Sequence, residues 1–387
     1  MNNGKPSILF HRHTAWQSDI RCSTNIYASL FMQRGFDIAY MQGIVHSGHV
    51  LTHRGQWRSW AEGPRRERDG WVFTPFSIVP YARRWPFNTA GAAHLSYLTC
   101  APTIPRLLQR GGMGAPDVIW SATPGSITLR KVFPRARFVF QVVDYYPAFS
   151  GDAVKPIERA DYRGADHVFV IGHALRRYLI DDHDVEPAKI TVLGQGVFAE
   201  EYQKDWPVPA ELATLPRPIG IWVGVLDKCD PDLFGAAAAA LRERGGTLVL
   251  IGPRADWAEQ LAGRSNNVRV LGPRSPDRVP AFLARSDLAL MLYDQRRQGK
   301  YRGQNPLKLY EFAAAGLPIV STPHDEFEFL NPPVIVVATP NHVAVAIESA
   351  LQGRENFQHR AREFTAIHSW AQAFERARDQ IERLISH

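Results

Sequence analysis

Short apolar runs alternate along the chain with longer segments whose apolar residues recur at helical spacing. Uninterrupted apolar runs predict buried strands of parallel sheets that helices cover on both faces. In the first half the predicted strands are Ser7–Phe10, Asp37–Met41, Trp71–Phe73, Val118–Ser121, Arg137–Asp144, Val168–Ile171 and Thr191–Leu193. In the second half they are Ile219–Val223, Thr247–Ile251, Arg269–Leu271, Leu288–Leu292, Pro318–Ser321 and Val334–Val337. This alternation predicts an α/β fold of doubly wound sheets.

A proline-rich passage, Glu200 to Pro218, separates the two sets of strands and has the composition of a linker. We therefore expect two Rossmann-like domains that face each other across a cleft, the first at residues 1–205 and the second at 206–355. The final segment, 356–387, is helical and carries an apolar face that includes Trp370 and Phe374. Its periodicity leaves open whether it covers the second domain or returns to the first.

Composition narrows the class of protein. The 387 residues are 45% hydrophobic and 21% charged, which excludes intrinsic disorder. No apolar run reaches the ~20 residues of a membrane span, and the polar N-terminus leads directly into a strand, so we expect no secretory signal. The three cysteines, Cys22, Cys100 and Cys229, show neither a disulfide framework nor zinc-ligand spacing. A cytoplasmic protein is expected.

Positive charge is concentrated in the first domain, where residues 1–140 hold 17 Lys and Arg against 6 Asp and Glu. A one-sided excess favours a polyanionic partner, although a solvated basic surface is the simpler alternative. We expect no nucleic acid, because the chain has no zinc-finger, RNA-recognition or helix-turn-helix pattern. Arg83, Arg84, Trp85 and Phe87 combine cations with large aromatics, which is typical of an interfacial anchor. Peripheral contact with the inner, anionic face of the cell membrane is therefore expected; the alternative is an ordinary helical segment over Ala90–Leu108.

The strongest local pattern runs from Asn305 to Pro318. Asn305 is a good N-cap, Pro306 suits the first helical position, and Gly316 suits the residue after the last turn. The helix would begin in a loop beyond a strand carboxyl end, where doubly wound domains bind ligands. Its free N–H groups and Lys308 suit a phosphate, and Glu311, one turn later, suits a ribose diol. The alternative is a capped surface helix with one Lys–Glu pair.

Other residues extend this nucleotide site. Glycines end three strands of the second domain, at Gly224, Gly252 and Gly272, where they let backbone approach a ligand. The expected donor-binding set is Gly224, Gly272, Tyr293, Asn305, Leu307, Lys308 and Glu311. Tyr293, at a strand end, is expected to stack on or bond to the base, or else to be a cleft-edge aromatic. Lys300 and Arg302 either close over the phosphates or are solvated.

Residues 219–321 resemble the nucleotide-sugar domain of the GT-B glycosyltransferases. The shared order is three Gly-ended strands followed by Pro-x-Lys-Leu-Tyr-Glu-Phe-x-Ala-x-Gly-x-Pro-Ile-Val-Ser. Upstream, 165–171 and 192–197 resemble the end of the first domain of such enzymes. The resemblance implies a nucleoside diphosphate sugar, with uridine favoured, in which Lys308 contacts the pyrophosphate and Glu311 the ribose. It also implies that the final helix crosses back to the first domain.

Within that fold, retaining members carry a glutamate eight residues before the ribose-binding one, and here that position is Gly303. A closer resemblance is to the membrane-associated glucuronosyltransferases of xanthan assembly, which invert, and to teichuronic-type transferases. The shared features are the segments Pro86-Phe87-Asn88-Thr89 and Gly194-Gln195-Gly196-Val197, a strand that ends at Asp144, and the pair Asp230-Pro231. In the former enzymes the aspartate that matches Asp144 is the general base. Glu311 replaces a glutamine of theirs, so the identity of the donor is not carried over.

Asp144 ends an apolar strand, and we expect its aromatic neighbours Tyr145, Tyr146 and Phe149 to desolvate it and raise its pKa. A plain loop aspartate is the alternative, and Asp19 and Asp152 are rival bases. The acceptor side is expected to include Arg12, His13, Asp19 and Arg21, which follow the first strand.

No cofactor or metal is expected, because Lys308 and a helix N-terminus can stabilise a departing diphosphate, and Asp230-Pro231-Asp232 suits a helix cap. The favoured hypothesis is an inverting glycosyltransferase that acts on a lipid-linked or polysaccharide-precursor acceptor at the membrane surface. A sugar-nucleotide epimerase of the same fold and a non-catalytic nucleotide-sugar-binding subunit remain alternatives.

Overall fold

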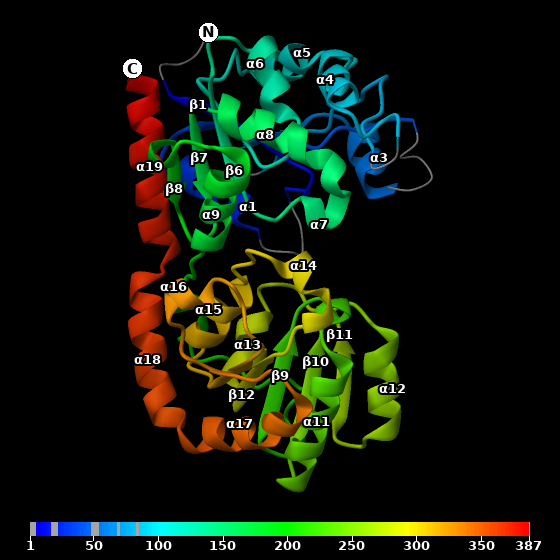
Figure 1. Ribbon diagram of the computed structural model, residues 1–387, viewed down its shortest axis with the longest axis vertical. Coiled ribbons are helices and arrows are strands. Elements are labelled where there is room, and N and C mark those ends of the chain that lie inside the picture. Colours follow the sequence, from blue (N-terminus) through cyan, green and yellow to red (C-terminus); the bar gives the residue numbers. More distant parts are fainter. Residues whose placement is uncertain (1–4, 17–21, 48–53, 68–69, 83–84, 387) are drawn as a thin grey trace. The chain divides into compact units, whose positions relative to one another are not determined.

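The computed structural model describes residues 5–16, 22–47, 54–67, 70–82 and 85–386. The chain forms two compact units, Met1–Leu193 with Phe374–His387, and Gly194–Ala373 (Figure 1). These boundaries differ from the expected ones at residues 205 and 355. The proline-rich passage belongs to the second unit, because Tyr202 and Leu212 are buried in its core.

The first unit is built on an eight-stranded sheet with the order β3-β4-β2-β1-β5-β6-β7-β8. Every pair is parallel except β3–β4. The strands are β1 Ser7–Arg12, β2 Asp37–Gln42, β3 Arg65–Glu67, β4 Gly70–Phe73, β5 Val118–Ser121, β6 Arg137–Val142, β7 His167–Val170 and β8 Ile190–Val192. All the expected strands are confirmed. The antiparallel edge strand β3 was not expected, because its three charged, partly exposed residues carry no apolar signal.

Helices cover both faces of this sheet. They are α1 Ser23–Gln33, α3 Arg54–Ala61, α4 Ala90–Leu98, α5 Ile104–Arg110, α6 Leu129–Val132, α7 Pro147–Ser150, α8 Lys155–Gly164 and α9 His173–His183. The segment Ala90–Leu108 is thus two helices. Pro102 lies between them, and it disfavours helical backbone both at its own position and at the residue before it.

The second unit holds a six-stranded parallel sheet with the order β11-β10-β9-β12-β13-β14. Its strands are β9 Ile219–Val223, β10 Thr247–Ile251, β11 Val268–Gly272, β12 Leu288–Met291, β13 Ile319–Ser321 and β14 Val334–Val336. Its helices are α10 Ala199–Tyr202, α11 Pro231–Glu243, α12 Asp256–Arg264, α13 Val279–Ala284, α14 Gln298–Tyr301, α15 Leu307–Ala314, α16 Phe327–Leu330, α17 Pro340–Gln352 and α18 Arg354–Ile367. The strand order reverses between β9 and β12, which makes this the ligand-binding switch point of a doubly wound sheet.

The expected C-terminal helix is two helices, α18 and α19 (Trp370–Ser386), and only the second returns to the first unit. On α19 the ring of Phe374 lies 4.9 Å from that of Phe31 on α1, and Glu375 pairs with Arg34 at 3.0 Å. The break falls where Val197 N–H donates to His368 O at 3.1 Å. The return of the chain to the first domain is confirmed. No helix of the described residues is long and apolar enough to span a bilayer.

Candidate functional site

Helix α15 is the centre of the expected donor site, and it begins one residue later than expected. Pro306 has extended backbone (φ −74°, ψ 124°) and is itself the N-cap. Asn305 is therefore not the cap: it is buried, and its Oδ1 accepts a hydrogen bond from Tyr310 Oη at 2.8 Å. The other end is as expected. Gly316 has φ +67°, and the N–H groups of Gly316 and Leu317 close the last turn on Ala313 O and Phe312 O.

Lys308 and Glu311 lie together on the first turns of α15. Lys308 Nζ donates to Glu311 Oε2 at 2.7 Å. A Lys–Glu pair on an ordinary surface helix has both members in water, but Glu311 is only 6% exposed. The neighbouring Leu307 is partly buried in the first turn. A fixed lysine beside a buried carboxylate at a helix N-terminus offers both a cation for a phosphate and an acceptor for hydroxyls.

The glycine turns of the second sheet come together at its carboxyl edge. Gly224 N–H donates to Ile251 O at 2.9 Å, and Gly252 N–H donates to Gly272 O at 3.1 Å. A Cβ on Gly252 would lie 1.8 Å from Gly224 O, so glycine is needed there for the turns to pack. Gly272 needs glycine for its φ of +71°, and the space beside it is open.

Tyr293 is enclosed rather than at an open edge. Its N–H donates to Thr322 Oγ1 at 3.0 Å, and its ring centroid lies 5.4 Å from Trp222, 5.5 Å from Tyr301 and 4.9 Å from His324. Burial raises the pKa of Tyr293, and the nearby Glu311 contributes. Tyr293 thus supports the strand ends around Glu311 and presents little of its ring to a base.

The loop between β12 and α15 carries the remaining cations. Arg296 Nε donates to the buried Asp294 at 2.7 Å, while the Lys300 side chain lies outside the described residues. Asp230 caps α11 as expected, since its Oδ1 accepts from Asp232 N at 2.9 Å and from Leu233 N at 3.2 Å. Across the described ranges no group of three His, Cys, Asp or Glu is placed to hold a metal. Metal independence stays a prediction.

In the first unit, Asp144 follows β6 at the carboxyl edge of the sheet and is half-buried. Burial lowers the pKa of Arg12, but Cys22, Tyr146, Tyr40 and Asp144 together raise it overall. Asp144 and Arg12 therefore attract each other, and Arg12 is fixed by Thr14 at 3.2 Å and Thr24 at 2.9 Å.

Of the three aromatic residues expected to desolvate Asp144, Tyr145 and Tyr146 are half-buried and Phe149 is exposed, and the desolvation of Asp144 stays a prediction. Phe149 is 41% exposed, and Tyr146 uses its hydroxyl to donate to Ala122 O at 3.0 Å. The rival base Asp152 is 81% exposed and pairs with Lys155 at 2.9 Å.

Of the four residues expected on the acceptor side, the structure describes two, Arg12 and His13. His13 is exposed, and its Nδ1 lies 2.7 Å from where a Cβ on Gly43 would stand, so it lines the β1 and β2 ends. Asp19 and Arg21 lie outside the described residues. Sequence reasoning missed His11, whose Nδ1 lies 3.0 Å from Ser121 Oγ and whose pKa is lowered well below 6.5 by burial and by His13.

Asp161 of α8 was missed too. Its carboxylate accepts from Gly125 N at 2.6 Å and from Ile127 N at 2.7 Å, which pins the loop after β5. Burial raises the pKa of Asp161 to about 8. Both His11 and Asp161 are fully buried within regular elements, so their positions along the chain carry no functional signal.

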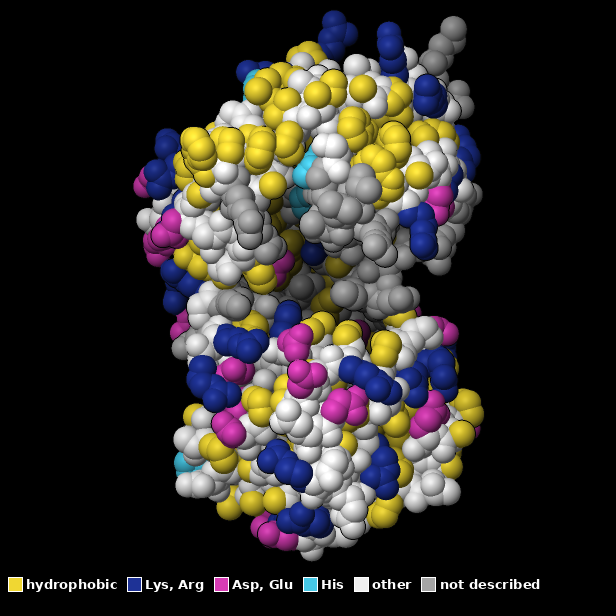
Figure 2. Space-filling model, turned by 90° about the vertical axis from the view of Figure 1, so that its right-hand side faces the viewer, with side chains coloured by type: hydrophobic (Ala, Val, Ile, Leu, Met, Phe, Trp, Pro, Cys, Tyr) yellow, Lys and Arg dark blue, Asp and Glu magenta, His cyan; other side chains and the backbone are white. Residues whose placement is uncertain are grey.

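Large apolar side chains are exposed around α4 in the first unit. Trp85 is 81% exposed and Phe87 40%, while Ile78, Leu95 and Leu98 are 68%, 45% and 44% exposed. Ile78 N–H donates to Thr99 O at 3.4 Å, so Ile78 lies at the end of α4. Figure 2 shows hydrophobic side chains gathered on the visible face of the first unit. Arg83 and Arg84 lie outside the described residues.

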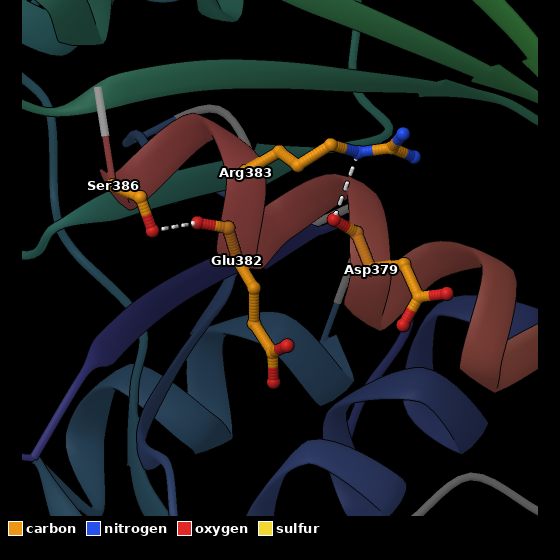
Figure 3. Close-up of a pocket in the computed structure, with 4 residues that line it drawn as sticks. All are labelled: Asp379, Glu382, Arg383 and Ser386. Carbon is orange, nitrogen blue, oxygen red and sulfur yellow. Dashed lines mark hydrogen bonds between the residues drawn. The ribbon is translucent and has the colours of Figure 1, made fainter.

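A pocket of ≈ 370 Å³ lies against the last turns of α19 (Figure 3). It is lined by Asp379, Glu382, Arg383 and Ser386. Arg383 Nε donates to Asp379 O and Ser386 Oγ donates to Glu382 O, both within the helix. Arg137, the first residue of β6, donates to Leu384 O at 3.0 Å, so this end of α19 lies at the amino edge of the first sheet. The pocket is therefore opposite the edge that carries Asp144 and is not part of the candidate site.

Comparisons with known proteins agree with this geometry. Residues 38–196 match the glycosyl transferase 4-like domain, and residues 217–353 match the glycosyl transferases group 1. TuaH of Bacillus subtilis (strain 168), which carries the name of a teichuronic acid biosynthesis glycosyltransferase, is 25% identical over 238 residues. That match covers 57% of this chain and 59% of TuaH, so the chain spans less than two thirds of this relative.

Solved structures share the fold over nearly the whole chain. A UDP-forming α,α-trehalose-phosphate synthase from Burkholderia vietnamiensis has a TM-score of 0.70 at 14% identity, over 98% of this chain and 97% of that one. Sucrose-phosphate synthase from Thermosynechococcus elongatus has a TM-score of 0.69 at 15% identity, over 99% of each chain. Anabaena HepE, solved with UDP, has a TM-score of 0.67 at 13% identity, over 98% of this chain and 100% of HepE. The two matching domains, the teichuronic relative and these folds place the chain among the GT-B glycosyltransferases.

Proposed function

We propose that this chain transfers a sugar from a UDP-sugar to a lipid-linked or polysaccharide-precursor acceptor at the membrane surface. The observation that carries the proposal is the Lys308–Glu311 pair at the N-terminus of α15, on the carboxyl edge of the second sheet. UDP is favoured because HepE is solved with UDP and the trehalose-phosphate synthases are UDP-forming. The teichuronic relative supports an acceptor in polysaccharide assembly.

The donor chemistry follows from the donors and acceptors on α15. The first N–H groups of the helix and Lys308 Nζ bind the diphosphate, and the Glu311 carboxylate accepts hydrogen bonds from the ribose diol. An ammonium has three N–H donors, so Lys308 can keep Glu311 in place while it binds a phosphate oxygen. Positive charge fixed beside the departing UDP stabilises the transition state without a metal.

Asp144 is proposed as the general base. Its carboxylate takes the proton of the acceptor hydroxyl, the freed oxygen attacks the anomeric carbon, and the bond from that carbon to the diphosphate oxygen breaks with inversion. The attraction of Arg12 favours the ionised carboxylate, which is the form that can accept a proton. Arg12 ends β1 and His13 follows it, in the same sheet as β6 but separated from it by β5, and both contribute to the acceptor side.

The membrane part of the proposal is supported by the surface around α4. Trp85, Phe87, Ile78, Leu95 and Leu98 all lie between residues 78 and 98 and all have exposed side chains, and contiguous exposed apolar surface is typical of an interaction site. Residues 70–143 contain eight Lys and Arg and one Asp or Glu. Exposed apolar side chains in a part of the chain rich in positive charge suit the anionic inner leaflet of the cell membrane.

The donor site is tested by isothermal titration of UDP, GDP, ADP, TDP and CMP into wild type, Lys308→Ala and Arg242→Ala. Arg242 is exposed in the last turn of α11, so its loss removes the same charge away from α15. We expect UDP to bind wild type and Arg242→Ala alike and Lys308→Ala at least tenfold more weakly, since a charged hydrogen bond contributes about 1.5–3 kcal/mol. Equal affinity for all three proteins, or no nucleotide binding at millimolar ligand, contradicts the proposal.

A further inference from the structure

The loop that leads into α15 has a glycine, Gly303, at the position where the resemblance to retaining glycosyltransferases implies a glutamate. Gly303 has φ +66°, a backbone conformation that a glutamate adopts only with strain. A carboxylate is nonetheless present at this position, because Asp325 Oδ2 accepts a hydrogen bond from Gly303 N–H at 3.0 Å. Asp325 comes from the loop after β13, a different element of the same carboxyl edge.

The position of Asp325 relates it to the sugar half of the donor. In a nucleoside diphosphate sugar, the transferred sugar is bonded to the phosphate that lies farther from the ribose. Glu311, proposed for the ribose, lies one turn inside α15, whereas Gly303 precedes the N-terminus of the helix. A diphosphate held by Lys308 and the first N–H groups therefore has its ribose toward Glu311 and its sugar toward the Gly303 loop. Asp325 is exposed, so hydroxyls of a bound ligand can reach it.

His324, next to Asp325 in the chain, does not neutralise the charge of the Asp325 carboxylate. The ring of His324 packs 4.9 Å from that of Tyr293 and 5.0 Å from that of Phe327. Burial lowers the pKa of His324 to about 4, although Asp325 acts in the opposite direction. At neutral pH the imidazole is therefore uncharged and does not form an ion pair with the Asp325 carboxylate. A carboxylate accepts hydrogen bonds from hydroxyl groups strongly, as in sugar recognition.

We propose that Asp325 is a specificity-determining residue that accepts hydrogen bonds from hydroxyls of the transferred sugar, in place of the side chain that Gly303 lacks. This inference rests on the proposed function, because it assumes that α15 holds the diphosphate of a UDP-sugar. It adds a residue that neither the α15 pattern nor the relatives identified.

The test compares Asp325→Ala and Asp325→Asn with wild type and with Glu243→Gln, an exposed carboxylate at the far end of α11. UDP affinity is measured by titration calorimetry, and the rate of UDP release from UDP-glucose, UDP-galactose, UDP-N-acetylglucosamine and UDP-glucuronate is measured without an acceptor. We expect both Asp325 variants to keep UDP affinity within about twofold and to lose about tenfold or more in kcat/KM for the preferred UDP-sugar. Glu243→Gln should match wild type in both.

A purely structural role for Asp325 gives a different pattern. Asn still offers an oxygen to Gly303 N–H, so Asp325→Asn would then behave as wild type while Asp325→Ala weakened UDP and UDP-sugar in parallel. That result overturns the inference and leaves the proposed function standing, as does unchanged kcat/KM in both variants. Failure of wild type to bind UDP overturns the proposed function, and the inference with it.

Discussion

The docking of α19 on the first unit makes a quantitative prediction for Phe374→Ala. Phe374 is 2% exposed, its ring meets that of Phe31 at 4.9 Å, and the Arg34 guanidinium lies 5.8 Å from its centroid. Truncating a buried phenylalanine costs about 3–5 kcal/mol in lost burial and cavity formation. We therefore expect the free energy of unfolding of the first unit to fall by about that amount.

Urea denaturation followed by tryptophan fluorescence measures this effect, because Trp120 lies 5.9 Å from Phe31 and reports on the first core. Two units can unfold separately, so the transitions are fitted individually. The control is Ile367→Ala on α18, where the side chain is 64% exposed and the expected change is within about 0.5 kcal/mol. A loss below about 1 kcal/mol for Phe374→Ala would show that α19 does not pack on the first unit as described.

Three further predictions concern other parts of the chain. Gly252→Ala should lower the unfolding free energy of the second unit by at least about 1–3 kcal/mol in urea melts, because the alanine Cβ would lie 1.8 Å from Gly224 O. The control, Gly235→Ala, places its Cβ in open space on α11 and should raise the unfolding free energy by about 0.5–1 kcal/mol. Burial raises the pKa of Asp161 to about 8, so between about pH 4 and 8 the folded protein holds this proton and the unfolded chain does not; the unfolding free energy therefore falls as pH rises through that window. Asp161→Asn should flatten this pH dependence in urea melts at each pH, and an unchanged pH dependence would refute the prediction. Trp85→Ser should weaken co-sedimentation of the protein with phosphatidylglycerol vesicles. Val345 is 64% exposed in the second unit, and Val345→Ser should leave co-sedimentation unchanged. Equal binding by both variants would argue against a membrane-binding surface around α4.

The sequence was sufficient for the elements whose signal is local. Buried strands such as β9 and β10 are short apolar runs, and both have the bounds expected. Gly316 and Asp230 were assigned their terminal and capping roles correctly, since each acts through backbone groups within a few residues.

Features that depend on distant contacts were not predictable from the sequence. Asn305 looked like an N-cap, but its side chain accepts from Tyr310 inside the core. Tyr293 looked like an open strand end, but Trp222 of β9 and His324 of the loop after β13 enclose it. The proximity of Asp325 to Gly303 depends on how two loops of the second sheet meet, and no local pattern records that.

The central claim is that the chain catalyses sugar transfer, and Asp144→Asn tests it most directly. Purified wild type and Asp144→Asn are incubated with radiolabelled UDP-sugars and a bacterial membrane lipid extract, and label is counted in the lipid phase. The account predicts lipid labelling by wild type from one UDP-sugar, with the rate reduced at least about 100-fold in Asp144→Asn, as for loss of a general base. Equal labelling by both proteins would contradict the assignment of Asp144, and the absence of labelling by wild type from every UDP-sugar would contradict the proposed activity itself.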